Sequence, residues 1–227
     1  MKRNFILYDD SEIVVVDKPA CVYVHPSPGH EKGTLCDALV KLFPEMRGVG
    51  SVERPGVVHR LDAETSGVMV FAKTRRAYLK LREAFESHAR VRKTYLAVLH
   101  GAPRPAQGML ETTIGRKSWD AKRMAVGAAG GKRAVTHWTV LEKHGPLAIV
   151  EFAIETGRTH QIRVHAAHLG HPIVGDVLYG DAAKDRALAV RPKRQLLHAV
   201  QLEFPHPLTN EMMCFAAPPP PDIIFAH

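Results

Sequence analysis

Hydrophobic and polar residues along the chain repeat mostly with the short period of β-strands. Apolar runs bounded by turn residues predict strands. These strands are expected near residues 5–8, 13–16, 68–71, 93–100, 109–114, 122–126, 133–143 and 147–155. The polar turn between the first two predicts a β-hairpin, and Gly145-Pro146 predicts the turn between the last two.

Helical spacing of apolar residues occurs in three places. Leucines recur between Thr34, which can cap a helix, and Pro44, which ends it. Thr74 is the expected cap of a second, amphipathic helix with a solvated polar face. The apolar face of that helix contains Tyr78, Leu81 and Phe85. Thr159 is the expected cap of a third helix that runs towards Leu169.

Many successive strands with few intervening helices predict an α+β fold. We expect a largely antiparallel mixed sheet flanked by helices, in a single domain over residues 1–227. Residues 217–227 form a predicted Pro-rich C-terminal tail. No glycine-rich dinucleotide or triphosphate motif is present, so nothing supports a bound nucleotide cofactor.

Composition restricts the class of protein further. The chain has 227 residues, 45% of them hydrophobic, which is enough to bury a core without metal or disulfides. Three widely spaced cysteines indicate free thiols in a reducing compartment. No segment is typical of a signal peptide or a membrane span, so we expect a soluble, cytoplasmic protein.

The net charge of +8 favours a polyanionic partner, although many basic proteins bind no nucleic acid. Basic residues surround Trp119 in the predicted hairpin at residues 116–133, Lys122 and Arg123 among them. Positive charge next to an aromatic ring suits stacking on a nucleobase, and a solvated hairpin explains the pattern about as well.

Residues 57–67 contain the most informative side chain, Asp62, which follows His59 and Arg60. Neighbouring cationic groups keep a carboxylate ionised, and an oriented carboxylate can act as a covalent nucleophile. Asp62 could also begin a turn that leads into the next strand, because aspartate and glycine are common turn residues. The local sequence by itself favours the turn.

A second polar cluster, residues 156–165, follows directly on a strand. With Ile162, Ala166 and Leu169 as the buried helix face, Arg158 and Arg163 would be left available for an anion at the helix N-terminus. Four histidines lie nearby, at positions 160, 165, 168 and 171. They do not converge on one point of a helical wheel, so surface and core-edge histidines are expected and a metal site is not.

The motifs together are more specific than any one of them, because they occur in a fixed order over residues 6–216. They are Asp17-Lys18-Pro19, Val24-His25-Pro26, His59-Arg60-Leu61-Asp62, Thr65-Ser66-Gly67, Tyr95-Leu96-Ala97, residues 157–165, Gly170-His171-Pro172, Gly175-Asp176 and Leu197-His198-Ala199. The series resembles the RluA-type family of RNA pseudouridine synthases. The resemblance implies a fold with a central active-site cleft and a cofactor-free isomerase that converts a uridine in structured RNA, transfer or ribosomal, to pseudouridine.

The resemblance also implies roles for individual residues. Asp62 matches the catalytic carboxylate, Tyr95 the tyrosine that stacks on the base, and Arg163 the arginine that pairs with the aspartate. Leu197 is expected to line the base pocket. The residues expected to bind the RNA are His59, Arg60, Arg158 and His160. Tyr95 by itself is also explained as a core aromatic on the face of its strand that carries Ala97 and Leu99.

Many relatives carry an additional N-terminal RNA-binding module, and here the first motif begins almost at once. We therefore expect that the catalytic domain selects the RNA, helped by Lys122 and Arg123, and that the protein is a monomer. Two other classes of protein are alternatives. A catalytically inactive RNA-binding protein of the same fold would not require Asp62, Tyr95 and Arg163, and a hydrolase lacks its own motif set.

Overall fold

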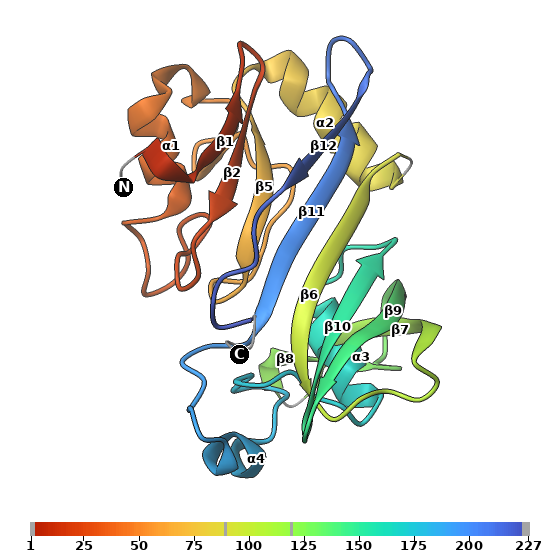
Figure 1. Cartoon of the computed structure of the whole chain (residues 1–227). Helices are drawn as coiled ribbons and strands as arrows, with labels where there is room; N and C mark the ends of the chain where they lie inside the picture. The colour runs from red at the N-terminus through yellow and green to blue at the C-terminus, as the bar shows by residue number, and fades with distance from the viewer. Residues whose placement is uncertain (1–2, 89, 119, 224–227) are drawn as a thin grey trace. The chain divides into compact units, whose positions relative to one another are not determined.

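The structure is a computed structural model that describes residues 3–88, 90–118 and 120–223. Contacts divide the chain into two compact units, and the single domain expected from the sequence stays a prediction. The first unit comprises Met1–Arg92 and Ala199–Pro218, and the second comprises Lys93–His198 and Pro219–His227. The fold class is α+β, as the succession of strands predicts (Figure 1).

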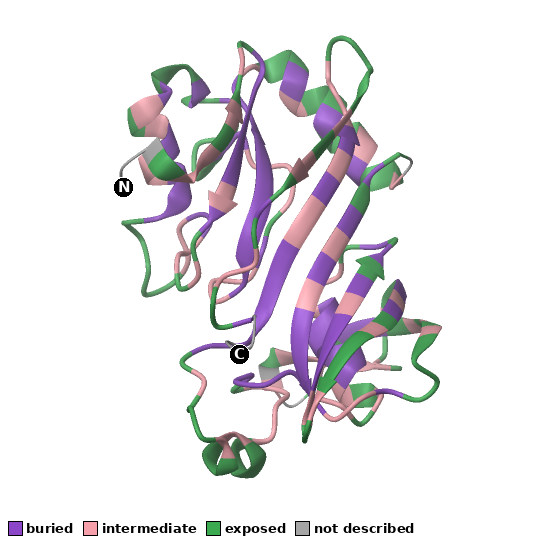
Figure 2. Ribbon diagram, in the orientation of Figure 1, coloured by how far each residue is buried: buried purple, intermediate pink, exposed green. Residues whose placement is uncertain are grey.

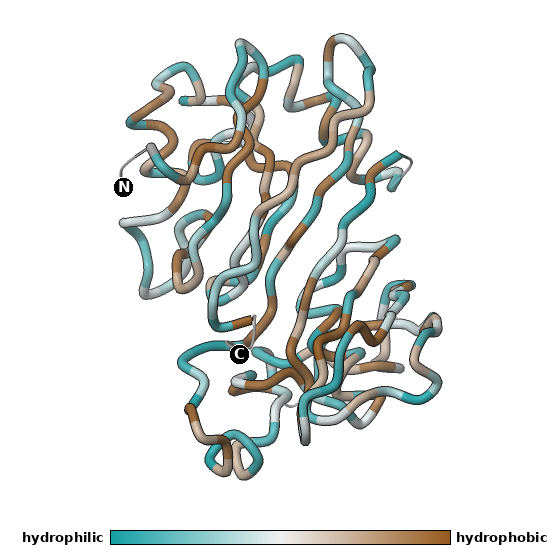
Figure 3. The backbone as a smooth tube through the Cα atoms, viewed as in Figure 1, coloured by the Kyte–Doolittle hydropathy of each residue, from teal (hydrophilic) through white to brown (hydrophobic). Residues whose placement is uncertain are grey.

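The sheet of the first unit has neighbouring strands in the order β1, β2, β5 and β11, and β12 pairs with β11. Strands β1 and β2 form the predicted antiparallel hairpin, and β2 pairs antiparallel with β5. The strand bounds are Ile6–Asp9 for β1, Ile13–Lys18 for β2, Ser66–Ala72 for β5, Leu197–Pro205 for β11 and Met212–Ala216 for β12. Every residue of β5 is buried, which fits its nearly continuous apolar sequence (Figures 2 and 3).

The two helices of the first unit begin where the sequence predicts. Helix α1 (Leu35–Leu42) is capped by Thr34, whose side chain accepts a hydrogen bond from the N–H of Asp37 while Asp37 caps Thr34 in return. Helix α2 (Arg75–Ser87) is capped by Thr74 and buries Ala77, Leu81 and Phe85. The shorter elements are the 3-10 helices Arg3–Phe5 and Pro44–Met46 and the strands β3 (Gly50–Ser51) and β4 (Arg54–Pro55).

The sheet of the second unit has the strand order β6, β10, β9, β7, β8, and each neighbouring pair is antiparallel. The bounds are Arg92–His100 for β6, Gln107–Lys117 for β7, Asp120–Val126 for β8, Lys132–His144 for β9 and Leu147–Ile154 for β10. Helix α3 (Gln161–His168) lies against β8 and β9, and α4 (Ala182–Ala187) follows it. These strands confirm the predicted antiparallel pattern.

The proline-rich C-terminal segment is irregular, as its sequence predicts, but it is not loose. The carboxylate of Asp222 accepts two hydrogen bonds of 2.8 Å from the guanidinium of Arg194. The side chain of Ile223 is 1% exposed and packs with Val98 and Val174. Residues 219–223 therefore pack within the second unit. Every helix within the described ranges is too short or too polar to cross a lipid bilayer.

Candidate active site

Asp62 lies in the loop that enters β5, in the first unit. Its carbonyl oxygen accepts a hydrogen bond of 3.1 Å from the N–H of Thr65, which closes a four-residue turn. Thr65 and Ser66 are buried, whereas Asp62 is half-buried. The turn that the sequence allowed is therefore present. It holds the backbone of Asp62 in place, and the residue is partly exposed.

A buried lysine anchors this turn. The Nζ of Lys18, whose side chain is fully buried at the end of β2, donates to the carbonyl oxygens of Pro19 (2.9 Å), Val22 (2.8 Å) and Ala63 (2.8 Å). Charge-assisted hydrogen bonds of this kind are among the stronger ones in proteins. The Asp-Lys-Pro motif contains this lysine, but its sequence alone indicates no role for Lys18. The lysine fixes the residue that follows Asp62.

Gly67 explains the last position of the Thr-Ser-Gly motif. Its φ is +114°, and a β-carbon there would lie 2.2 Å from the carbonyl oxygen of Ala199 on β11. Only glycine combines this backbone angle with so close an approach. The start of β5 can therefore approach β11 this closely only because residue 67 has no side chain.

His59 points into the first unit. Its Nε2 accepts a hydrogen bond of 3.1 Å from the N–H of Val70, and its ring stacks on Phe85 at 4.6 Å. Because Nε2 accepts, the ring is neutral and carries its proton on Nδ1. Through these two contacts His59 attaches the loop to β5 and α2. Arg60 is exposed. The expected contact of both residues with RNA stays a prediction.

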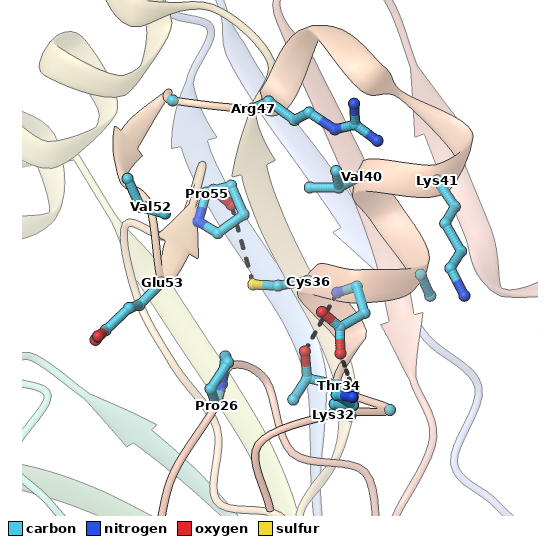
Figure 4. A pocket seen from close by; sticks show the side chains of 14 residues that line it. Pro26, Lys32, Thr34, Cys36, Val40, Lys41, Arg47, Val52, Glu53 and Pro55 are labelled. Atoms are coloured by element: carbon cyan, nitrogen blue, oxygen red, sulfur yellow. Dashed lines mark hydrogen bonds between the residues drawn. The ribbon is translucent and has the colours of Figure 1, made fainter.

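A hollow of about 770 Å³ lies beside α1 in the first unit (Figure 4). Cys36 lines it and donates a long hydrogen bond from its Sγ to the carbonyl oxygen of Pro55 (4.0 Å). Burial, helped by the charge of Asp37, raises the pKa of the Cys36 thiol to about 12. Such a thiol is unreactive at neutral pH. Among the described residues that line the hollow, none is a predicted site residue.

Arg163 lies on α3 in the second unit and forms a buried bidentate ion pair. Its Nε and Nη2 donate to the carboxylate oxygens of Asp176 at 2.7 and 2.8 Å. The side chains are 6% and 0% exposed. Burial alone would raise the pKa of Asp176, but the hydrogen bonds and charge of Arg163, with the N–H groups of Leu178 and Tyr179, hold it below its ordinary value.

This arrangement corrects two expectations about the helix. Residues 161–166 are all buried, so α3 has no outward face on which Arg163 could stand beside Arg158 for an anion. The N-cap is His160 in the left-handed region (φ 56°), and Thr159 is not the cap. The predicted partnership of Arg163 with Asp62 stays a prediction.

Tyr179 connects Arg163 to the basic hairpin. The guanidinium carbon of Arg163 lies 5.2 Å from the centre of the Tyr179 ring, a cation–π distance. The Tyr179 hydroxyl accepts a hydrogen bond of 2.8 Å from the N–H of Met124 on β8 and is 2.9 Å from Nδ1 of His160. Tyr179 is not among the site residues expected from the sequence. Its position three residues after the Gly175-Asp176 motif was the available signal.

Tyr95 occupies β6, opposite Phe152 on β10. Its side chain is buried on the same face as Ala97 and Leu99, as the strand alternation predicts. Leu197 is also buried, at the start of β11. Stacking of Tyr95 on a base and contact of Leu197 with it stay predictions.

The histidines near α3 are held by the protein. Nδ1 of His165 lies 2.8 Å from Oγ1 of Thr136, and Nε2 lies 2.9 Å from Oγ1 of Thr112. Burial, helped by the charge of His168, lowers the pKa of His165 to about 4. The expectation of surface or core-edge histidines is wrong for His165, which is fully buried. Within the described ranges, no three histidine, cysteine, aspartate or glutamate side chains are grouped so that they could hold a metal ion.

In the basic hairpin formed by β7 and β8, strand β8 carries Lys122, which is exposed, and Arg123, which is half-buried. The Nε of Arg123 lies 3.3 Å from the carboxylate of Asp120. Arg133 is bound by two hydrogen bonds, of 2.6 and 3.1 Å, to Glu111. Its charge is thus largely balanced. Trp119, the aromatic residue of the predicted stacking surface, lies outside the described residues.

Comparison with known proteins decides the family. A sequence model described as RNA pseudouridylate synthase matches residues 12–168, which include Asp62, Tyr95 and Arg163. The chain belongs to this family. It is 42% identical over 217 residues to an uncharacterised RNA pseudouridine synthase of Synechocystis, covering 95% of the chain and 65% of that protein.

Other relatives agree. Ribosomal large subunit pseudouridine synthase D of Neisseria meningitidis is 44% identical over 225 residues, covering 96% of the chain and 59% of that protein. The structure of human RNA pseudouridylate synthase domain containing 1 superposes with a TM-score of 0.77 and 31% identity, covering 96% of the chain and 85% of that structure. The chain therefore spans 59–65% of the length of these two bacterial relatives.

Proposed function

We propose that this protein isomerises a uridine in structured RNA to pseudouridine, with Asp62 as the nucleophile. Membership of the RNA pseudouridylate synthase family carries the proposal, because the matched region contains Asp62, Tyr95 and Arg163. The anchored turn at Asp62 supports it, since an attacking carboxylate has to be held in a fixed orientation.

In the proposed reaction, the bond between C1′ of the ribose and N1 of uracil breaks. The base rotates, and a bond forms between C1′ and C5. The proton on C5 leaves and N1 gains one, so the product is an isomer of the substrate and no redox partner is needed. Asp62 would attack either the sugar or the base, and would be released when the new bond forms.

A uridine in folded RNA hides the atoms that react. The enzyme therefore has to extrude the nucleotide, at a cost of a few kcal/mol. In this proposal Tyr95 stacks on the extruded base, Leu197 contacts it, and Arg163 keeps the carboxylate of Asp62 ionised. Exposed basic residues such as Arg60 and Lys122 would contact phosphates, which predicts binding that weakens strongly with salt.

Large-subunit ribosomal RNA is the first substrate to test, because a relative with 44% identity is named for it. Transfer RNA is the second. Pseudouridines would be mapped by chemical labelling in cells with and without the protein. A uridine modified only when the protein is present identifies the substrate, and identical maps in both RNA classes count against the proposal.

Asp62→Asn tests the nucleophile, because the amide is nearly isosteric but neutral. We expect no pseudouridine from purified Asp62→Asn protein, with RNA binding retained. Glu86→Gln is the matched control, since it removes one charge from the exposed surface of α2. Pseudouridine formed by Asp62→Asn at a near wild-type rate would overturn the proposed mechanism.

A further inference from the structure

Lys93 is a buried lysine that the proposed chemistry leaves without a role. It lies at the start of β6, two residues before Tyr95 and on the same buried face. The residue as a whole is 7% exposed. Within the described part of the chain, the ammonium of Lys93 forms neither a hydrogen bond nor an ion pair, although its backbone pairs with Ile154 on β10. An ammonium that is largely shielded from water and has no acceptor in the protein would be stabilised by an anionic ligand that reaches it.

The ammonium faces the loop that precedes α3. The Nζ of Lys93 lies 3.5 Å from the position that a β-carbon on Gly157 would occupy. Gly157 itself is exposed, so the loop is thin at this point and the ammonium lies just beneath the surface. A ligand can therefore reach Lys93 past a residue that has no side chain.

Arg158 adds a second positive charge at the same place. Its guanidinium Nε donates to the carbonyl oxygen of Arg133 at 2.8 Å, and its backbone N–H donates to Oε1 of Gln161 at 3.0 Å. Gln161 is buried and also donates to the carbonyl oxygen of Val135 and to Oγ1 of Thr136, both at 2.9 Å. The loop that carries Arg158 is thus fixed before any ligand binds.

No acid offsets these two charges. Arg158 forms no ion pair with any described residue, and the nearby carboxylates are already engaged. Glu111 binds Arg133 through two hydrogen bonds, and Glu155 lies 2.9 Å from Nε2 of His137. Burial, together with the charge of Arg158, lowers the pKa of Lys93 to about 8, as expected for an ammonium that lacks a counter-ion.

We propose that Lys93 and Arg158 together bind one phosphate of the RNA backbone. This inference rests on the proposed function for the identity of the anion, and it replaces the pair of Arg158 and Arg163 that the sequence suggested. Lysine supplies a point charge, and arginine supplies directional donors, a combination that suits a phosphodiester. Because Lys93 shares a strand face with Tyr95, the phosphate would belong to a nucleotide close to the target.

The test measures the affinity for unmodified large-subunit ribosomal RNA over a series of salt concentrations. Lys93→Met keeps the length of the buried side chain and removes the charge, and Arg158→Gln removes the second charge. We expect each variant to bind about tenfold more weakly at physiological salt. The salt slope, meaning the slope of the logarithm of the binding constant against the logarithm of the salt concentration, should become smaller in magnitude by about one. The double variant is expected to bind no more than about twofold more weakly than either single variant, because both residues share one phosphate.

Lys143→Met is the matched control, an exposed lysine of the same unit on β9. Thermal unfolding separates binding from folding. Lys93→Met should melt at the wild-type temperature or above, since it replaces a buried charge that has no partner.

Three results would overturn the phosphate site: wild-type affinity and salt slope in Lys93→Met, additive losses in the double variant, or the same loss in Lys143→Met. A wild-type protein that binds RNA but forms no pseudouridine in this or any other RNA would overturn the proposed function. The phosphate site would then still hold if the variants bind as expected. A wild-type protein that binds no RNA would overturn both.

Discussion

The Nζ of Lys18 lies 2.8 Å from the carbonyl oxygen of Ala63, the residue that follows Asp62. The two residues are 45 positions apart in sequence, and the ammonium is fully buried. It also donates to the carbonyl oxygens of Pro19 and Val22. One lysine therefore fixes the loop after β2 and the turn that carries the proposed nucleophile.

Replacing Lys18 should disturb both folding and activity. In Lys18→Met three carbonyl oxygens lose a charge-assisted donor, and we expect the free energy of unfolding to fall by about 2–4 kcal/mol. The rate of pseudouridine formation should fall further than RNA binding, because the turn at Asp62 is released. Urea unfolding and single-turnover assays measure the two effects. Lys80→Met, on the exposed face of α2, should change neither, and a Lys18→Met protein with wild-type stability would contradict the anchoring role.

Gly67 should tolerate no side chain. Gly67→Ala would place a β-carbon 2.2 Å from a backbone oxygen at a φ of +114°, so we expect a loss of at least about 3 kcal/mol or failure to fold. Gly127→Ala is the control, since Gly127 also has positive φ (+70°) but open space around it. The control should lose about 1 kcal/mol from backbone strain alone. Equal losses in the two variants, measured by chemical denaturation, would rule out the steric explanation.

Local signals in the sequence predicted the elements well. Thr34 and Thr74 cap their helices because a threonine side chain can accept a hydrogen bond from the first turn, an interaction that needs no tertiary structure. The same preference failed at Thr159. There the loop is held by the side chain of Gln161, and His160 takes the left-handed conformation at the N-cap.

Partners distant in sequence were the part that could not be predicted. The motifs placed Asp62, Tyr95 and Arg163 in the candidate site, but no local pattern indicated that Asp176 binds Arg163 or that Lys18 binds Ala63. Such pairs depend on how the strands and loops pack. The burial of α3 on nearly all sides is likewise a tertiary effect, and its sequence shows only a weak apolar face.

The ion pair between Arg163 and Asp176 predicts a large effect on stability. Removing one partner of a buried ion pair leaves the other charge without compensation, which typically costs about 3–5 kcal/mol. We expect this loss in Arg163→Met, together with a large loss of isomerisation rate. Adding Asp176→Asn should restore part of the stability, because the buried negative charge is then gone, but it should not restore the rate. Urea unfolding measures the stability of both variants. A double variant less stable than Arg163→Met alone would contradict this account.

His165 should make stability depend on pH between about 4 and 6.5. In the folded protein its pKa is lowered to about 4, whereas the ordinary value is 6.5, so the unfolded chain binds the proton first as the pH falls. The contribution of neutral His165 is therefore fully present above pH 6.5 and is lost as the pH approaches 4. The shift corresponds to about 3 kcal/mol. In His165→Gln this part of the pH dependence should disappear. His137→Gln is the control, because the side chain of His137 is 43% exposed, and this variant should keep the pH dependence. Unfolding free energies measured from pH 7 to pH 4 test this, and parallel curves for wild type and His165→Gln would show that His165 is not the responsible group.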